Sequence, residues 1–156
     1  MIEIEIPGVG TLTFRNLVLD VNGTIARDGK LIDGVLERLN ELRSRLDIHL
    51  VTADTHGSQE QIDQLLNLKA VRIPREHQAQ AKADYIEKLG VKSVAAIGNG
   101  ANDALMLERA AMGIFVIGPE GSAVEAMLKA KVIAGSIREA LDLLLFPKRI
   151  TATLRR

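Results

Sequence analysis

The chain has 156 residues, a length that suits one folded domain of ~100–200 residues. Hydrophobic residues make up 47% of it and charged residues 26%, which excludes disordered, collagen-like and coiled-coil proteins. Twenty Lys and Arg residues balance twenty Asp and Glu residues, so net charge gives no support for a nucleic-acid partner or an anionic membrane. The absence of cysteine rules out disulfides, thiolate metal sites and cysteine nucleophiles.

The N-terminal segment carries glutamates where a secretory signal peptide needs basic residues. The longest apolar run, at about 110–118, is much shorter than the ~20 residues that span a bilayer. These features predict a cytoplasmic protein with no membrane partner.

The chain begins with a predicted β-hairpin over about 1–15. Residues 2–6 alternate Ile and Glu, a turn with Pro and Gly follows, and residues 11–14 supply the second strand. The tail, 147–156, has a mixed composition that suits either a short helix or an arm onto a neighbouring subunit. Pro147 ends the helix before it.

Between hairpin and tail, in a core at 16–146, strand patterns alternate with helix patterns. Short apolar runs predict strands at 17–20, 48–51, 71–73, 93–97, 113–117 and 132–134. Helical spacing predicts helices at about 35–46, 56–67, 79–89, 102–110, 121–129 and 136–146. This alternation with short connections predicts an α/β fold: one Rossmann-like doubly wound sheet, mainly parallel, with helices on both faces.

Polar residues gather directly after three predicted strands. They are the segments 20–24, 52–54 and 98–103, and Lys82 lies early in the helix before the last of these strands. Because ligands of such sheets bind beyond the carboxyl ends of the strands, these residues are expected to share a pocket.

The residue types suit phosphoryl transfer to a carboxylate. Asp20 can act as the nucleophile, while the hydroxyl of Thr52 and the ammonium of Lys82 can neutralise phosphate oxygens. Magnesium suits the remaining oxygens, because it is held by one or two carboxylates with waters and phosphate, and Asp20 and Asp103 can supply carboxylates. Gly23 allows the backbone to turn sharply beside the anion.

Taken in order, Asp20-Val-Asn-Gly-Thr24, Thr52, Lys82 and Gly98-Asn-Gly-Ala-Asn-Asp103 resemble the four motifs of the haloacid dehalogenase superfamily. The resemblance is closest to its soluble, P-type-ATPase-like branch. It implies a Rossmann-like sheet, a phosphorylated substrate, magnesium and an aspartyl-phosphate intermediate.

The same resemblance implies a role for each matching residue. The catalytic residues are Asp20, Asn22, Thr52 and Lys82. The phosphate-binding residues are Gly23, Thr24, Thr52, Ala53, Lys82 and Asn102. The magnesium ligands are Asp20, Asn22 through its backbone carbonyl, Asn99 and Asp103.

Two positions depart from the family pattern. Asn22 stands where the phosphatases have an aspartate that acts as general acid and base, and general acid–base help is worth ~10²–10⁴-fold in rate. Asn99 stands where the pattern has a metal-ligating aspartate. We therefore expect weaker magnesium binding and slow turnover. Asp54 is open to two interpretations, as a substitute acid or ligand and as a helix N-cap.

The spacing of the motifs leaves no room for a cap domain. Only a flap-like segment, 25–32, and one helix separate Asp20 from Thr52, and one helix and one strand separate Thr52 from Lys82. The sequence therefore resembles the capless type. An open site must be closed by a macromolecular substrate or a neighbouring subunit, so we expect a homo-oligomer.

Other interpretations of the same residues stay open. Asn22-Gly23 also suits a type I′ hairpin turn. Gly98-x-Gly100, with Glu120 about twenty residues later, also suits a dinucleotide-binding fingerprint, although Asp103 stands where the fingerprint has its third glycine. His49, His56 and His77 show no metal-ligand spacing. The main alternative to an enzyme is a regulatory module that binds phosphate or nucleotide without turnover. A purely structural subunit is a further functional alternative.

Overall fold

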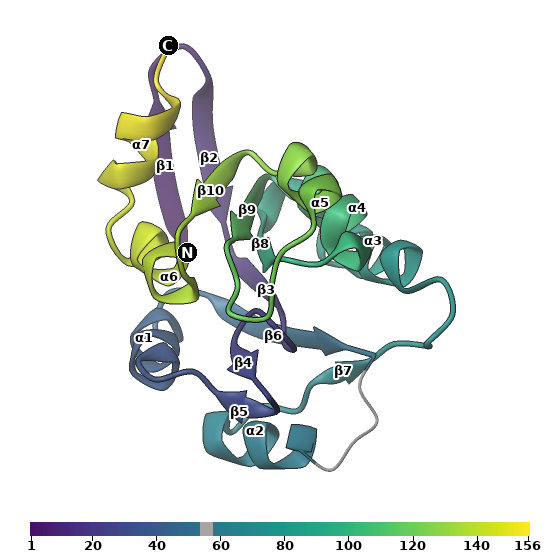
Figure 1. Ribbon diagram of the computed structural model, residues 1–156. Helices are drawn as coiled ribbons and strands as arrows, with labels where there is room; N and C mark the ends of the chain where they lie inside the picture. The colour runs from purple at the N-terminus through teal and green to yellow at the C-terminus, as the bar shows by residue number, and fades with distance from the viewer. Residues whose placement is uncertain (54–57) are drawn as a thin grey trace.

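The computed structural model describes residues 1–53 and 58–156. Its centre is a sheet of six strands in the order β10-β9-β8-β3-β6-β7, and every neighbouring pair is parallel (Figure 1). The strands are β3 (Asn16–Asp20), β6 (Asp47–Thr52), β7 (Val71–Arg72), β8 (Val94–Gly98), β9 (Met112–Val116) and β10 (Val132–Ala134). The prediction of a doubly wound parallel sheet is confirmed.

Alternating side chains of the central strand face two separate hydrophobic cores. In β3, Leu17 and Leu19 belong to one core and Val18 to the other, and all three are fully buried. Burial on both faces explains why the strand is an uninterrupted apolar run.

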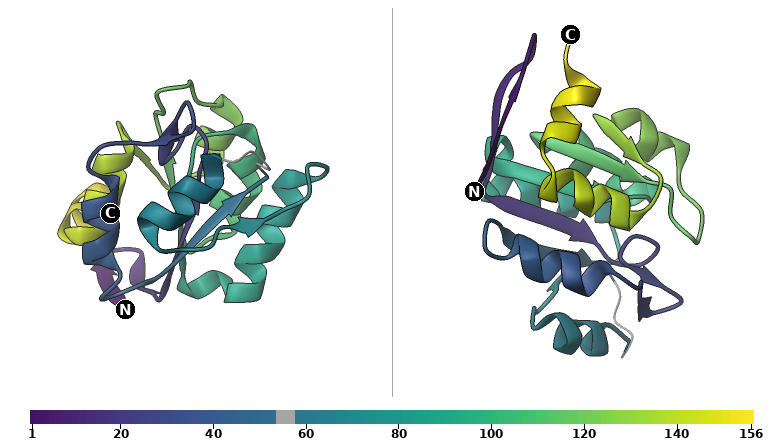
Figure 2. Two further views of the ribbon diagram at one scale, coloured as in Figure 1. Left: turned by 90° about the horizontal axis from the view of Figure 1, so that it is seen from below. Right: turned by 90° about the vertical axis from the view of Figure 1, so that its left-hand side faces the viewer.

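Helices cover both faces of the sheet (Figures 1 and 2). One face carries α1 (Val35–Leu42) and α6 (Ile137–Leu145), with α2 (Ser58–Leu66) beside α1, and the other carries α3 (Gln78–Leu89), α4 (Ala104–Arg109) and α5 (Val124–Lys129). Short 3₁₀ turns, Val91–Ser93 and Ala101–Asp103, precede β8 and α4. Within the described ranges, no helix has the length and apolar character needed to cross a membrane.

Three helix boundaries within the described residues differ from the prediction by two residues or more. The helix predicted to end at 46 ends at Leu42. The helix predicted from 121 begins at Val124, because Gly121 has a φ of 91° and belongs to a turn. The helix predicted from 102 begins as the 3₁₀ turn, in which the amide of Asp103 donates to the carbonyl of Gly100. The predicted start of the helix at 56 lies outside the described residues, as do Asp54 and His56.

The N-terminal hairpin consists of β1 (Ile2–Ile6) and β2 (Gly10–Phe14) and projects beyond the sheet (Figures 1 and 2). Its buried isoleucines pack against the tail, which forms the helix α7 (Lys148–Leu154). The hydroxyl of Thr151 donates to the carbonyl of Glu5, and the amide of Arg156 donates to the carbonyl of Pro7. The tail is therefore a helix on the chain's own hairpin, the first of the two alternatives.

The strand order places a topological switch point at the central strand. From β3 the chain moves outward through β6 and β7, and it then returns to the other side of β3 with β8. In sheets of this type, ligands bind at the carboxyl ends of the strands near the switch. The predicted flap is a small hairpin of β4 (Ala26–Arg27) and β5 (Lys30–Leu31).

His49 of β6 contacts one side chain of α3 and one of β3. Its Nδ1 lies 2.9 Å from the Tyr85 hydroxyl, and its Nε2 lies 3.1 Å from Oδ1 of Asn16. Because Asn16 Oδ1 can only accept, neutral His49 carries its proton on Nε2. Burial lowers the pKa of His49 below its ordinary value of 6.5, although Asp47 opposes this.

A histidine with a depressed pKa in the folded state contributes stability that is present above pH 6.5 and lost as the pH falls below it. We expect the free energy of unfolding to decrease less between pH 7 and pH 5 in His49→Gln than in the wild type. Urea denaturation at both pH values measures this. Equal decreases in the two proteins would contradict it.

Candidate active site

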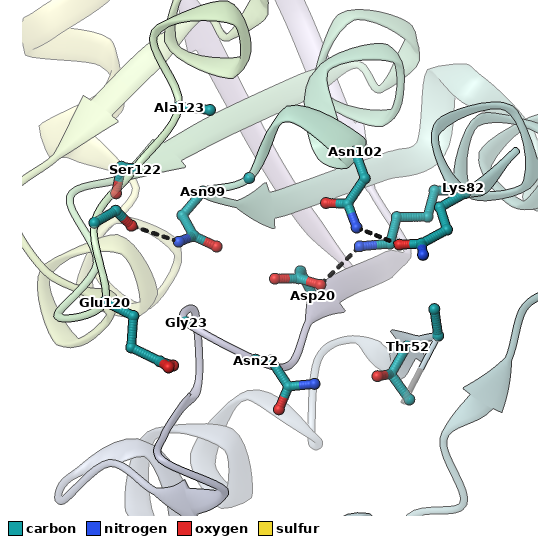
Figure 3. A pocket seen from close by; sticks show the side chains of 14 residues that line it. Asp20, Asn22, Gly23, Thr52, Lys82, Asn99, Asn102, Glu120, Ser122 and Ala123 are labelled. Carbon is teal, nitrogen blue, oxygen red and sulfur yellow. Dashed lines mark hydrogen bonds and ion pairs between the residues drawn. The ribbon is translucent and has the colours of Figure 1, made fainter. Parts of the chain in front are cut away.

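A cleft of about 380 Å³ opens at the carboxyl ends of β3, β6 and β8 (Figure 3). Of the ten predicted site residues, eight line it: Asp20, Asn22, Gly23, Thr52, Ala53, Lys82, Asn99 and Asn102. The other two, Thr24 and Asp103, are fully buried behind its wall. The four motifs, which span more than eighty residues of sequence, therefore meet in one place.

Lys82 forms the base of the cleft. Its Nζ lies 2.7 Å from Oδ1 of Asp20 and 2.6 Å from Oδ1 of Asp103, and its side chain is only 1% exposed. Burial lowers the pKa of Lys82, but the two carboxylates raise it by more, so that the net shift is upward. Lys82 therefore keeps its positive charge in the folded protein.

Asp103 supports this lysine from within the protein. Its Oδ2 accepts hydrogen bonds from the amides of Asn99 and Gly100, both at 3.0 Å. Burial and the nearby Asp20 raise the pKa of Asp103 to about 6, against the opposing effect of Lys82. The same two amides would have to bind a pyrophosphate in the dinucleotide interpretation, and Asp103 already occupies them.

The two carboxylate oxygens of Asp20 face different partners. Oδ1 faces Lys82, while Oδ2 lies 2.8 Å from the hydroxyl of Thr24. The same hydroxyl lies 2.8 Å from Oδ1 of Asn99, so its single proton serves two acceptors. Thr24 thus fixes the orientation of the Asp20 carboxylate and stays away from the cleft surface.

The loop after β3 requires glycine at position 23. Gly23 has a φ of 78°, and a Cβ there would lie 2.9 Å from Nδ2 of Asn99. A type I′ turn needs positive φ at both central positions, whereas Asn22 is not among the residues with positive φ. The loop is therefore not that hairpin turn.

The side chain of Asn99 joins two loops. Its Oδ1 accepts from Thr24, and its Nδ2 donates to the carbonyl of Gly121 at 2.9 Å (Figure 3). The backbone of Gly118 also approaches the nucleophile loop so closely that a Cβ would lie 2.3 Å from the carbonyl oxygen of Gly23. A carboxylate at position 99 could not donate to Gly121, so this geometry requires the amide.

Comparison with known proteins gives the family. The model for haloacid dehalogenase-like hydrolases matches residues 5–111, more than half of the chain. The chain belongs to the haloacid dehalogenase-like hydrolase family. The uncharacterized protein MJ0073 of Methanocaldococcus jannaschii is 47% identical over 64 residues, which cover 41% of this chain and 69% of that protein.

Solved structures agree with the fold of this hydrolase. The 3-deoxy-D-manno-octulosonate 8-phosphate phosphatase from Moraxella catarrhalis, in complex with magnesium ion, phosphate ion and KDO, has a TM-score of 0.65 and 19% identity, covering 91% of this chain and 94% of that chain. A phosphoserine phosphatase in its apo form has a TM-score of 0.69 and 14% identity, covering 86% of this chain and 99% of that chain. At these identities the likeness concerns the fold.

The donor atoms of the hydrolase suit magnesium only with additional ligands. Asp20 is the accessible carboxylate beside Asn22 and Asn99, because Asp103 is buried in its ion pair with Lys82. In the described part of the chain, no group of three or more His, Cys, Asp or Glu side chains is arranged to hold a metal. Since magnesium needs only one or two carboxylates when waters and phosphate complete its shell, the residues fit an ion that binds together with phosphate.

Several residues that line the cleft were not predicted as part of this site. They are Gln78, Glu120, Gly121, Ser122 and Ala123. Gln78 begins α3 and accepts a hydrogen bond from Nδ2 of Asn102 at 2.7 Å. The loop at 118–123 follows the carboxyl end of β9. The expectation that ligands bind beyond the carboxyl ends of the strands could therefore have indicated this loop as well.

Replacing the buried lysine tests the ion-pair arrangement. Lys82→Met should lower the free energy of unfolding by about 3–5 kcal/mol at pH 8, because it leaves Asp103 buried without a cation. The loss should be smaller at pH 5, since removal of Lys82 raises the pKa of Asp103 further and protonation then cancels the charge. Urea denaturation at the two pH values provides the comparison, and a loss that grows at low pH would count against this arrangement.

Replacing the bridging amide separates its two contacts. In Asn99→Asp, the carbonyl of Gly121 loses its donor, and the free energy of unfolding should fall by about 1–3 kcal/mol. Magnesium should raise the melting temperature of this variant more than that of the wild type, because a second carboxylate faces the site. Asn102→Asp, which adds a carboxylate on the side of the cleft near Gln78, is the matched control. If magnesium raised the melting temperature of both variants equally, the placement of Asn99 beside the magnesium site would be refuted.

Proposed function

We propose that this hydrolase is a magnesium-dependent phosphohydrolase or phosphotransferase that works through an aspartyl-phosphate on Asp20. The observation that carries the proposal is the contact of Lys82 Nζ with Oδ1 of Asp20 at the base of a polar cleft. A buried cation beside a carboxylate nucleophile offsets the charge of an incoming phosphoryl group at the atom that attacks it.

In this proposal each oxygen of Asp20 has its own task. Oδ1 attacks phosphorus, and the bond from phosphorus to the leaving oxygen breaks. Lys82 and the hydroxyl of Thr52, together with Asn102 and the backbone of Gly23 and Ala53, hold the transferred group. Thr24 keeps Oδ2 turned towards Asn99 throughout the reaction.

Magnesium, when bound, supplies positive charge to the phosphate oxygens. The side of Asp20 that carries Oδ2, with the backbone carbonyl of Asn22 and the amide of Asn99, would hold it. Only one of these groups carries a negative charge, so the ion is bound weakly without phosphate. The known structures of similar fold include phosphatases, one of them in complex with magnesium ion and phosphate ion, which supports this reading of the cleft.

The residues also favour slow turnover. Asn22 cannot donate a proton to a leaving group or take one from water, and Asn99 gives no charge to a metal. The open cleft is consistent with a homo-oligomer in which a neighbouring subunit closes the site over a phosphorylated substrate. The same two asparagines support the second candidate, a module that binds phosphate or nucleotide without turnover.

A phosphoryl donor tests the proposed nucleophile. With magnesium and acetyl phosphate, intact mass spectrometry should show one added phosphoryl group on the wild type and none on Asp20→Asn. Asp84→Asn, an exposed change on the same helix as Lys82, is the matched control and should retain the adduct. An adduct that survives Asp20→Asn would refute the proposal, and phosphate binding without any adduct would favour the regulatory module.

A further inference from the structure

Hydrolysis through Asp20 requires a group that exchanges protons in the cleft. An alkoxide leaving group needs a proton, and the water that attacks the aspartyl-phosphate must lose one. Among the described residues that line the cleft, the titratable side chains are Asp20, Lys82 and Glu120. Asp20 is the nucleophile, and Lys82 is held as a cation by two carboxylates. Glu120 is the titratable side chain that remains among the described residues of this inner cleft.

Glu120 lies on a tightly fixed turn. The amide of Gly121 donates to the carbonyl of Gly118, and the hydroxyl of Ser122 accepts from the amide of Gly118 at 2.7 Å and donates to the carbonyl of Val116 at 2.9 Å. Such a turn presents its third residue, Glu120, at the tip. These hydrogen bonds fix the backbone from which the exposed side chain of Glu120 extends.

Two contacts place this turn against the nucleophile loop. Asn99 donates to the carbonyl of Gly121, and the backbone of Gly118 meets the carbonyl of Gly23. Glu120 consequently lines the cleft that contains Asp20 and also its outward continuation, and Asn22 lines both as well. In Figure 3, the carboxylate of Glu120 lies beside Gly23 on the side of the cleft that carries Asn22.

This placement matches the path of the leaving group. The attacking and leaving oxygens lie roughly in line on opposite sides of phosphorus, so a group expelled by Asp20 points away from it and towards the cleft opening. The attacking water enters along the same line. Glu120 lies at this opening, because it lines both the inner cleft and its continuation.

We propose that Glu120 is the general acid and base of this site, in place of the amide at Asn22, and that Asn99 is the positioning residue that holds its turn. This inference rests on the proposed aspartyl-phosphate function. Protonated Glu120 gives its proton to the leaving oxygen as Asp20 attacks phosphorus. Ionised Glu120 then takes a proton from water as the water oxygen attacks, the bond between Asp20 and phosphorus breaks, and phosphate leaves with Glu120 protonated again.

Acetyl phosphate separates the two half-reactions experimentally. Acetate leaves without protonation, so Glu120→Gln should form the phosphoenzyme at a rate within about twofold of the wild type. Decay of the phosphoenzyme needs the base, and general-base help of ~10²–10⁴-fold predicts decay at least about a hundredfold slower in this variant. Glu125→Gln, an exposed change at the start of α5, is the matched control and should decay like the wild type.

A conservative variant distinguishes catalysis from a structural effect. Glu120→Asp keeps the carboxylate on a shorter side chain and should restore part of the decay rate that Glu120→Gln loses. Decay in Glu120→Asp as slow as in Glu120→Gln would indicate that the carboxylate is not the group that acts.

The outcomes separate the two proposals. Decay in Glu120→Gln within about twofold of both the wild type and Glu125→Gln overturns the role of Glu120 and leaves the aspartyl-phosphate in place. Wild-type decay no faster than that of free acetyl phosphate also overturns it. A wild type that forms no adduct contradicts the proposed function itself and this inference with it.

Discussion

The structure of the site depends on one buried cation held between two carboxylates. Lys82 connects the end of β3 with the segment that follows β8, because Asp20 and Asp103 both contact its Nζ within 2.7 Å. Two negative charges this close would repel each other in a buried setting without the lysine. Asp103 in turn depends on the amides of Asn99 and Gly100. Removal of the lysine would leave both carboxylates buried without a cation.

Beside this ion pair, Asn99 makes two hydrogen bonds where an aspartate could bind a metal. An aspartate at that position would add charge for a metal, whereas the asparagine accepts from Thr24 and donates to the carbonyl of Gly121. The amide thus joins the loop of the nucleophile to the turn that carries Glu120. Asparagine at position 99 therefore supplies no charge for a metal and at the same time holds the backbone of the turn that carries Glu120.

Much of the fold could be predicted from the sequence, because its signals are local. Apolar runs such as 17–20 indicate buried strands, and the switch point follows from their alternation with helices. The positions of Thr24 and Asp103 could not be predicted, because their side chains turn inward to hydrogen bonds with residues distant in the fold. The turn at 118–121 depends on a backbone contact with Gly23, almost one hundred residues earlier, that leaves no pattern in either segment.

A crystal structure of the protein grown with magnesium and beryllium fluoride, which mimics a phosphoryl group on a carboxylate, would show directly whether Asp20 accepts a phosphoryl group. We expect beryllium bonded to Oδ1 of Asp20, with its fluorides in contact with Lys82 Nζ and the hydroxyl of Thr52, and Oδ2 still facing Thr24. Beryllium fluoride bound elsewhere, with Asp20 unmodified and still paired to Lys82, would contradict the assignment of Asp20 as the residue that accepts the phosphoryl group.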